Sequence, residues 1–153
     1  MKKARRLKPA QSGIAAQHYV AAEISRRGHA VAMTVRNAQG VDILASRIDG
    51  SRAVGIQVKC GQDSGKWWML DAKAERMTSR TLVYVLVNLN GPGGTPTFHV
   101  VPSRVVAASI SSEYREYIRG RRRDGRTRKE SLIRRFADKD GKYLDRWELL
   151  GLD

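Results

Sequence analysis

The chain has 153 residues, 41% of them hydrophobic, which suits one domain with a packed core and excludes a disordered tail. Its formal net charge of +14 at pH 7 favours a polyanionic partner, with nucleic acid ahead of an anionic membrane surface. No apolar run approaches the roughly 20 residues that cross a bilayer, and a single cysteine, Cys60, excludes an internal disulfide. We therefore expect a cytoplasmic protein without membrane contact. The basic, acid-poor start is also compatible with an organelle transit peptide.

The first expected element is a helix over residues 13–27, with Ser12 as its N-cap and Gly28 as its C-terminal glycine. Its apolar stripe consists of Ile14, Val20, Ala21 and Ile24. Gln17 falls on the same stripe. An amide on a buried face needs a hydrogen-bond partner, so Gln17 is expected to meet a polar group of the sheet.

Strand patterns follow the helix at residues 29–35, 41–48 and 52–60. Asp49-Gly50 separates the last two and is a strong hairpin signal. The remaining expected elements are a weak helix at 71–77, strands at 81–89 and 97–101, a helix from Ser103 that continues through 114–122, and a short terminal helix with Leu144, Trp147 and Leu150 on one side. The run 81–89 is almost wholly apolar, as is typical of a strand buried on both faces. This order predicts an α/β or α+β domain around one sheet.

The hairpin predicts which side chains share a face. With a two-residue turn at Asp49-Gly50, the numbers of paired residues sum to 99, so Asp42 lies opposite Gln57. Lys59 points to the same side because it is two positions from Gln57. A four-residue loop would place Asp42 opposite Lys59 and keep the shared face, whereas a three-residue loop would break it. The other face of the third strand is wholly apolar and serves the core: Val54, Ile56, Val58 and Cys60.

Two interpretations of this polar face remain open. One is a cross-strand ion pair between Asp42 and Lys59 with no chemical role. The other is a cation site, because carboxylate and amide oxygens are hard ligands suited to Mg²⁺. In that site the ammonium of Lys59 would orient a water molecule or offset charge on a phosphoryl group.

The residues Val41-Asp42-Ile43 followed by Gln57-Val58-Lys59 resemble the PD-(D/E)xK nuclease superfamily, in the branch with QxK in place of (D/E)xK. The resemblance implies a single restriction-endonuclease-like domain, similar also to Holliday junction resolvases. It has an αβββαβ core, a mixed central sheet and, in this chain, additional C-terminal helices. The matching order runs from about Ser12 to Pro102.

The resemblance implies a role for each polar residue. Asp42 would be the metal carboxylate, Gln57 a neutral ligand or water positioner, and Lys59 the catalytic lysine, with Mg²⁺ or Mn²⁺ as cofactor. Gln17 stands where this branch has a metal-site glutamate. The proline of the motif is absent before Asp42, and the neutral Gln17 leaves Asp42 as the one carboxylate of the site.

Excess positive charge is concentrated at two places. Residues 1–22 contain five basic and no acidic residues, and residues 115–135 contain ten basic and three acidic ones. We expect these segments to clamp the phosphates of duplex or branched DNA. The residues assigned to this role are Lys2, Lys3, Arg5, Arg6, Arg121, Arg122 and Arg123. The expected organisation is a basic arm (1–11), a nuclease-like α/β domain (12–112) and a basic extension (113–153) whose terminal helix packs back.

Together these features predict a DNA-binding protein that acts as a divalent-metal-dependent endonuclease. A catalytically inactive module of the same fold that binds DNA or RNA is the alternative. A third interpretation is a basic RNA-associated protein in which Asp42 and Lys59 form a plain ion pair. A homodimer is compatible with the endonuclease, since two DNA strands require two sites.

Overall fold

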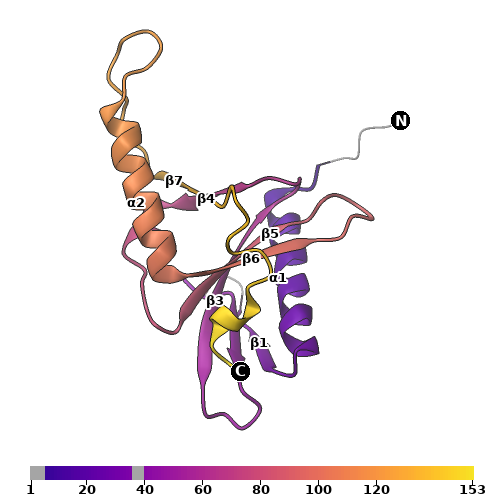
Figure 1. The fold of residues 1–153 in the computed structure, drawn as a ribbon. Coiled ribbons are helices and arrows are strands. Elements are labelled where there is room, and N and C mark those ends of the chain that lie inside the picture. Colours follow the sequence, from indigo (N-terminus) through magenta and orange to yellow (C-terminus); the bar gives the residue numbers. More distant parts are fainter. Residues whose placement is uncertain (1–5, 36–39) are drawn as a thin grey trace.

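The computed structural model describes residues 6–35 and 40–153. A mixed five-stranded sheet has the strand order β1-β2-β3-β5-β6, and a two-stranded sheet pairs β4 with β7 (Figure 1). The elements in chain order are α1 (Pro9–Arg26), β1 (Ala30–Met33), β2 (Ile43–Ser46), β3 (Ala53–Gly61), β4 (Trp67–Asp71), the 3-10 helix η1 (Ala72–Glu75), β5 (Leu82–Asn88), β6 (Thr97–Pro102), α2 (Ser103–Arg119), β7 (Ile133–Ala137) and the 3-10 helix η2 (Trp147–Leu150). No helix of the described ranges is both long and apolar enough to cross a membrane.

Helix α1 begins one turn earlier than predicted. Pro9 occupies its first position, where a fixed φ and a missing N–H fit a helix start. Ser12 is therefore not the N-cap; it lies inside the helix, buried, and its hydroxyl donates to the carbonyl of Pro9 at 3.0 Å. Ile14 is 44% exposed because the buried stripe runs through Ala16, about 200° around the helix from it. The predicted end is confirmed: Gly28 follows the helix with φ +87°.

The predicted register of the β2–β3 hairpin is confirmed. Ile43 pairs with Ile56 and Ser46 with Ala53, so the paired numbers sum to 99. The turn is longer than expected, however. Ile48 and Ser51 do not pair, and the main chain closes through the N–H of Arg47 and the carbonyl of Arg52 at 3.0 Å. Because the longer turn takes one residue from each strand, Ile48 and Ser51, the register of the remaining pairs is unchanged.

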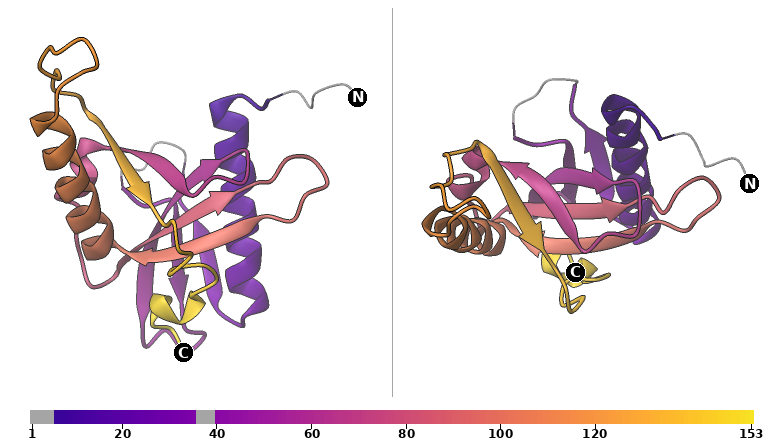
Figure 2. Two further views of the ribbon diagram at one scale, coloured as in Figure 1. Left: turned by 45° about the horizontal axis from the view of Figure 1, so that its top comes forward. Right: turned by 90° about the horizontal axis from the view of Figure 1, so that it is seen from above.

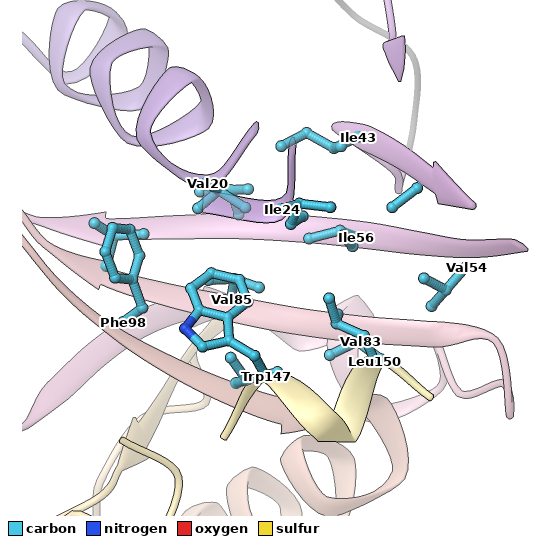
Figure 3. Packing of buried hydrophobic residues seen from close by; sticks show 14 of the residues in the cluster. Val20, Ile24, Ile43, Val54, Ile56, Val83, Val85, Phe98, Trp147 and Leu150 are labelled. Atoms are coloured by element: carbon cyan, nitrogen blue, oxygen red, sulfur yellow. The ribbon is translucent and has the colours of Figure 1, made fainter. Parts of the chain in front are cut away.

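Strand β5 is buried on both faces, as predicted, and separates two core clusters. On one face, α1 and η2 pack against the sheet, and Figure 3 shows Val20 and Ile24 of α1 in one core with Ile56, Val85 and Trp147. On the other face, α2 and the β4–β7 pair cover β5 and β6 (Figure 2). The sheet therefore forms the middle layer of a single mixed α/β domain.

The β4–β7 pair was not predicted. Trp68 pairs with Phe136, and both are buried beneath α2. Between β3 and β5, where the αβββαβ order has a helix, the chain forms β4 and the single 3-10 turn η1. The predicted helix at 71–77 is thus wrong in length and type.

The C-terminal segment is part of the core. Helix α2 runs without a break through residue 112, where the sequence suggested a boundary. Trp147 and Leu150 are buried in the core cluster formed with α1, whereas Leu144, which the i, i+3, i+6 spacing had grouped with them, is 42% exposed.

Candidate active site

Asp42 lies where β2 separates from β3. Its own N–H donates to the carbonyl of Ile56 at 2.8 Å, and the last β2–β3 pair is Ile43 with Ile56. Strand β3 continues to Gly61 beside β5, beyond the reach of β2. The backbone of Asp42 is fixed on its other side by Thr34, whose N–H donates to the Asp42 carbonyl at 3.0 Å. This position directs a carboxylate into the gap that β2 leaves beside β3.

The Asp42 carboxylate accepts three hydrogen bonds from three different sources. Gln17 Nε2 of α1 donates to Oδ1 at 3.1 Å. Gln57 Nε2 donates to Oδ2 at 2.6 Å, and the backbone N–H of Val58 donates to the same oxygen at 2.7 Å. The structure therefore brings together Gln17, Asp42 and Gln57, with all three side chains half-buried. The Val58 N–H was not anticipated, because it becomes free only where β2 stops.

Lys59 follows on the same face of β3 as Gln57 and is half-buried beside Leu86, its register partner on β5. Its ammonium forms no ion pair with Asp42, so the plain ion-pair interpretation is wrong. Among the described residues it has no hydrogen-bond acceptor either. A half-buried cation beside a polar cluster, without a carboxylate of its own, is suited to attract an anionic group of a substrate.

Tyr84 borders the same face, since it is the register partner of Gln57 on β5. Burial raises the pKa of its phenol, which therefore stays protonated and neutral at physiological pH. Among the described residues, the charged groups of this cluster are thus the carboxylate of Asp42 and the ammonium of Lys59.

The side chains around Asp42 offer ligand atoms of the kind that a divalent cation needs. One carboxylate and two amide oxygens are hard ligands of the kind that Mg²⁺ and Mn²⁺ accept. Gln17 and Gln57 present N–H groups to Asp42 here, and their carbonyl oxygens would have to turn toward an ion. Within residues 6–35 and 40–153, no three or more His, Cys, Asp and Glu side chains are grouped so that they could hold a metal ion. Glu23 is not a replacement, because it pairs with Arg26 and Arg27 on the surface of α1. The residues fit a cation chemically, with a single anionic ligand.

Gly40 stands near the place where the motif has proline. Its φ is +86°, and a Cβ atom on it would lie 2.6 Å from Cε of Met77. The backbone conformation therefore disfavours any other residue here, and a side chain would also require the flexible end of Met77 to move. The glycine lets the chain turn close to Met77 just before Asp42.

The basic residues lie apart from this cluster. Lys2, Lys3 and Arg5 fall outside the described residues, and Arg6 pairs with Asp63 at 2.9 Å on the surface. The residues 121–123 form an exposed loop between α2 and β7, held by a bridge between Arg121 and Thr127. In Figure 1 this loop and the indigo start of the described chain project toward the same end of the molecule, on opposite flanks.

Comparison with known proteins shows that the fold of this chain resembles that of a solved structure. No protein-family model matches the chain, and no curated protein matches it. The solved structure of a bacterial homing endonuclease, I-Ssp6803I, matches with a TM-score of 0.55 and 15% sequence identity, over 95% of this chain and 94% of that one. At this identity the match establishes a shared fold, and the chemistry must be argued from the residues of this chain.

Proposed function

We propose that this chain is a DNA-binding protein and a divalent-metal-dependent endonuclease that hydrolyses phosphodiester bonds, with Asp42, Gln17, Gln57 and Lys59 as its site. The observation that carries the proposal is the convergence of two amides from separate elements on one carboxylate. On the same strand face lies Lys59, which has no ion-pair partner among the described residues. The fold shared with a homing endonuclease supports it.

Each residue has a distinct task in this proposal. Asp42 would hold the ion, and the amide oxygens of Gln17 and Gln57 would complete the protein's share of its ligands. Bound there, Mg²⁺ or Mn²⁺ supplies Lewis-acid polarisation of the scissile phosphate and lowers the pKa of an attacking water. Lys59 would orient that water or offset the negative charge that builds on the phosphoryl group.

A single carboxylate makes metal binding depend on DNA. Divalent-cation sites commonly combine one or two carboxylates with water molecules and substrate phosphates. With Asp42 as its anionic ligand, the site would reach full occupancy when a DNA phosphate contributes oxygens. We therefore expect weak metal affinity without DNA and stronger affinity with it.

The basic segments would supply most of the DNA affinity. Arg121, Arg122 and Arg123 are exposed, and together with Arg6 and the preceding Lys2, Lys3 and Arg5 they would neutralise backbone phosphates of duplex or branched DNA. Two copies of the chain would be needed to cut both strands at one place, so a homodimer belongs to this proposal.

A second candidate is a catalytically inactive module that binds DNA or RNA. The observation in its favour is that both oxygens of Asp42 are occupied by N–H donors, with Val58 and the two glutamines acting as structural partners. In that case the cluster would stabilise the β2–β3 junction and would not respond to metal.

Incubation with supercoiled, linear and four-way-junction DNA distinguishes the two candidates. The proposal requires nicking or cutting that depends on Mg²⁺ or Mn²⁺ and stops with EDTA. Binding without cleavage in either metal would favour the inactive module. Comparing affinities for DNA and RNA of matched length would then identify its ligand.

A further inference from the structure

A second polar and aromatic site lies away from Asp42, between α2 and β7. A groove of about 500 Å³ opens there, with walls from the last turns of α2, from β7 and from the segment that precedes β7. Figure 1 shows this end of α2 projecting beyond the sheet, next to the arginine-rich loop. None of its lining residues belongs to the candidate active site.

The groove contains an ordered stack of rings and guanidinium groups. The rings of Tyr114 and Tyr117 are nearly parallel, with centroids 6.2 Å apart and an angle of 22° between them. The guanidinium carbon of Arg134 lies 3.4 Å from the centroid of Tyr114, and that of Arg128 lies 4.1 Å from the centroid of Tyr117. Cations on the faces of aromatic rings are electrostatically favourable.

The inner half of this stack is fixed by hydrogen bonds. Arg134 is buried, pairs with Glu75 and donates to the carbonyl of Ser131 at 2.6 Å. The hydroxyl of Tyr114 accepts the N–H of Ser131 at 2.9 Å. These contacts hold α2 against β7, so the inner half has a structural role.

The outer half is open. Tyr117 is 47% exposed. Arg128 Nε is covered by protein and has no hydrogen-bond partner in the described part of the chain, and its terminal nitrogen makes one long contact of 3.5 Å to the carbonyl of Arg121. A ligand cannot reach the covered Nε, but the two terminal nitrogens of Arg128 share only this one long contact among the described residues, so they keep donor capacity for an anionic or carbonyl-bearing ligand.

Positive charge predominates around this open half, and the carboxylate that lines the groove, Glu113, is paired with Arg135. Four exposed arginines follow α2 in the adjacent loop, and the carboxylate among them, Asp124, lies 3.9 Å from Arg122 and 4.0 Å from Arg126. Arg121 and Arg123 have no carboxylate partner among the described residues. This charge more than offsets the partial negative charge of the α2 C-terminus.

A half-exposed aromatic ring beside guanidinium groups that have no carboxylate partner in the described part of the chain matches the chemistry of a nucleotide. Bases stack on aromatic rings and on guanidinium planes, while arginines bind the linking phosphates. In a duplex the base faces are covered by neighbouring bases, and the grooves expose only the base edges. Since the guanidinium of Arg128 covers one face of the Tyr117 ring, an incoming base must stack on this arginine–tyrosine pair, and only a base whose own face is uncovered can do so.

We propose that the groove between α2 and β7 binds unpaired nucleotides of DNA, with a base stacked at Tyr117 and its phosphates held by Arg128 and the arginines of the adjacent loop. This inference rests on the proposed function in taking DNA as the substrate. It narrows the substrate to DNA with a single-stranded segment, such as a branch, a flap or a melted site.

The test compares oligothymidylate with an abasic oligonucleotide of the same length, by fluorescence anisotropy in EDTA. The two probes carry the same phosphates, and only one carries bases. The wild-type protein is expected to bind oligothymidylate about 5- to 150-fold more tightly, as one stacked base would give. Tyr117→Ala should remove this preference, and Tyr117→Phe should keep it. Tyr19→Ala is the matched control, because Tyr19 is also helical and 47% exposed.

Equal affinity for the two probes, or an unchanged preference in Tyr117→Ala, would overturn the inference. Much tighter binding of oligouridylate than of oligothymidylate would also overturn it, in favour of RNA. Because the assay contains no metal, its result does not depend on cleavage. Asp42→Asn should retain the base preference even if nuclease activity is lost or was never present. The proposal for the groove and the proposal for the active site can therefore be contradicted independently of each other.

Discussion

The side-chain amide of Gln17 donates a hydrogen bond to Oδ1 of Asp42 at 3.1 Å, and thereby joins the middle of α1 to the start of β2. A carboxylate at position 17 would place two anions at this contact. The neutral amide instead satisfies Asp42 in the absence of a cation. Gln17 thus stabilises the cluster in the absence of metal. It also leaves the cluster with less negative charge to attract a metal ion.

Gln17→Glu should reverse that balance. Without metal, the variant loses an N–H donor and gains a repelled, partly desolvated carboxyl group, so its free energy of unfolding should fall by about 1–3 kcal/mol. With Mn²⁺ it should regain this stability and respond at lower metal concentration than the wild type, because its site has two anions. Thermal melts across a Mn²⁺ titration measure both effects.

His18→Glu is the control for added charge, since His18 neighbours Gln17 in sequence but is exposed on α1. It should leave the metal response unchanged. Identical Mn²⁺ responses in wild type and Gln17→Glu would place position 17 outside any cation site.

Lys59→Met tests the role of the ammonium, since methionine keeps a similar length without the charge. If Lys59 offsets charge on the phosphoryl group, cleavage should slow by about 100- to 1,000-fold. The stabilisation by Mn²⁺ in the presence of DNA should remain, because Lys59 is not a ligand. Single-turnover nicking rates measure the first effect, with Lys73→Met, at an exposed position of η1, as the control. A Lys59→Met rate equal to that of the wild type would remove Lys59 from the mechanism.

The arginine loop should determine the salt dependence of DNA binding. Each phosphate contact contributes about 0.9 to the slope of log affinity against log salt on duplex DNA. Replacing Arg121, Arg122 and Arg123 together by alanine should therefore lower the slope by up to about 2.7. Titrations of a fluorescent duplex at several salt concentrations give the slope. A wild-type affinity that does not change with salt would contradict the role of the basic segments.

The C-terminal segment should be essential for stability. Trp147 is 7% exposed and packs on Phe98 with ring centroids 5.4 Å apart. Trp147→Ala should lower the free energy of unfolding by about 3–5 kcal/mol. Trp67→Ala removes the same side chain from a site that is 52% exposed and should cost much less. Urea denaturation of both variants measures the difference, and similar losses would show that η2 is not part of the core.

Much of the central sheet could be predicted because its signals are local. Asp49-Gly50 marks the turn, the alternation in 52–60 marks the buried face, and the apolar run 81–89 marks a strand covered on both sides. The register was predicted correctly even though the turn is longer, since Ile48 and Ser51 separate symmetrically about its centre.

The β4–β7 pair could not be predicted in this way, because its strands are more than 60 positions apart and each is short. Arg134 and Arg135 also give β7 the appearance of a charged loop. Arg134 can be buried there because it forms an ion pair with Glu75 and its guanidinium lies over the Tyr114 ring. These contacts exist only in the folded chain.

The meeting of Gln17, Asp42 and Gln57 was predicted, but the hydrogen bonds between them were not. Periodicity turned Gln17 inward, and the register placed Asp42 beside Gln57. The point at which β2 ends was not visible in the sequence, so the free Val58 N–H was missed. Val58 and both glutamines are bonded to Asp42, and the ion pair with Lys59, one of the two interpretations left open by the sequence, does not form.

The most direct test of the central claim is the nicking of supercoiled DNA by wild type and Asp42→Asn, in Mg²⁺, in Mn²⁺ and in EDTA, beside DNA binding in EDTA. The account predicts metal-dependent nicking by the wild type. Asp42→Asn should be slower by more than about 100-fold, since Lewis-acid stabilisation is worth several kcal/mol, and its DNA affinity should be nearly unchanged. Equal nicking by the two proteins, or no nicking by the wild type in either metal, would contradict it.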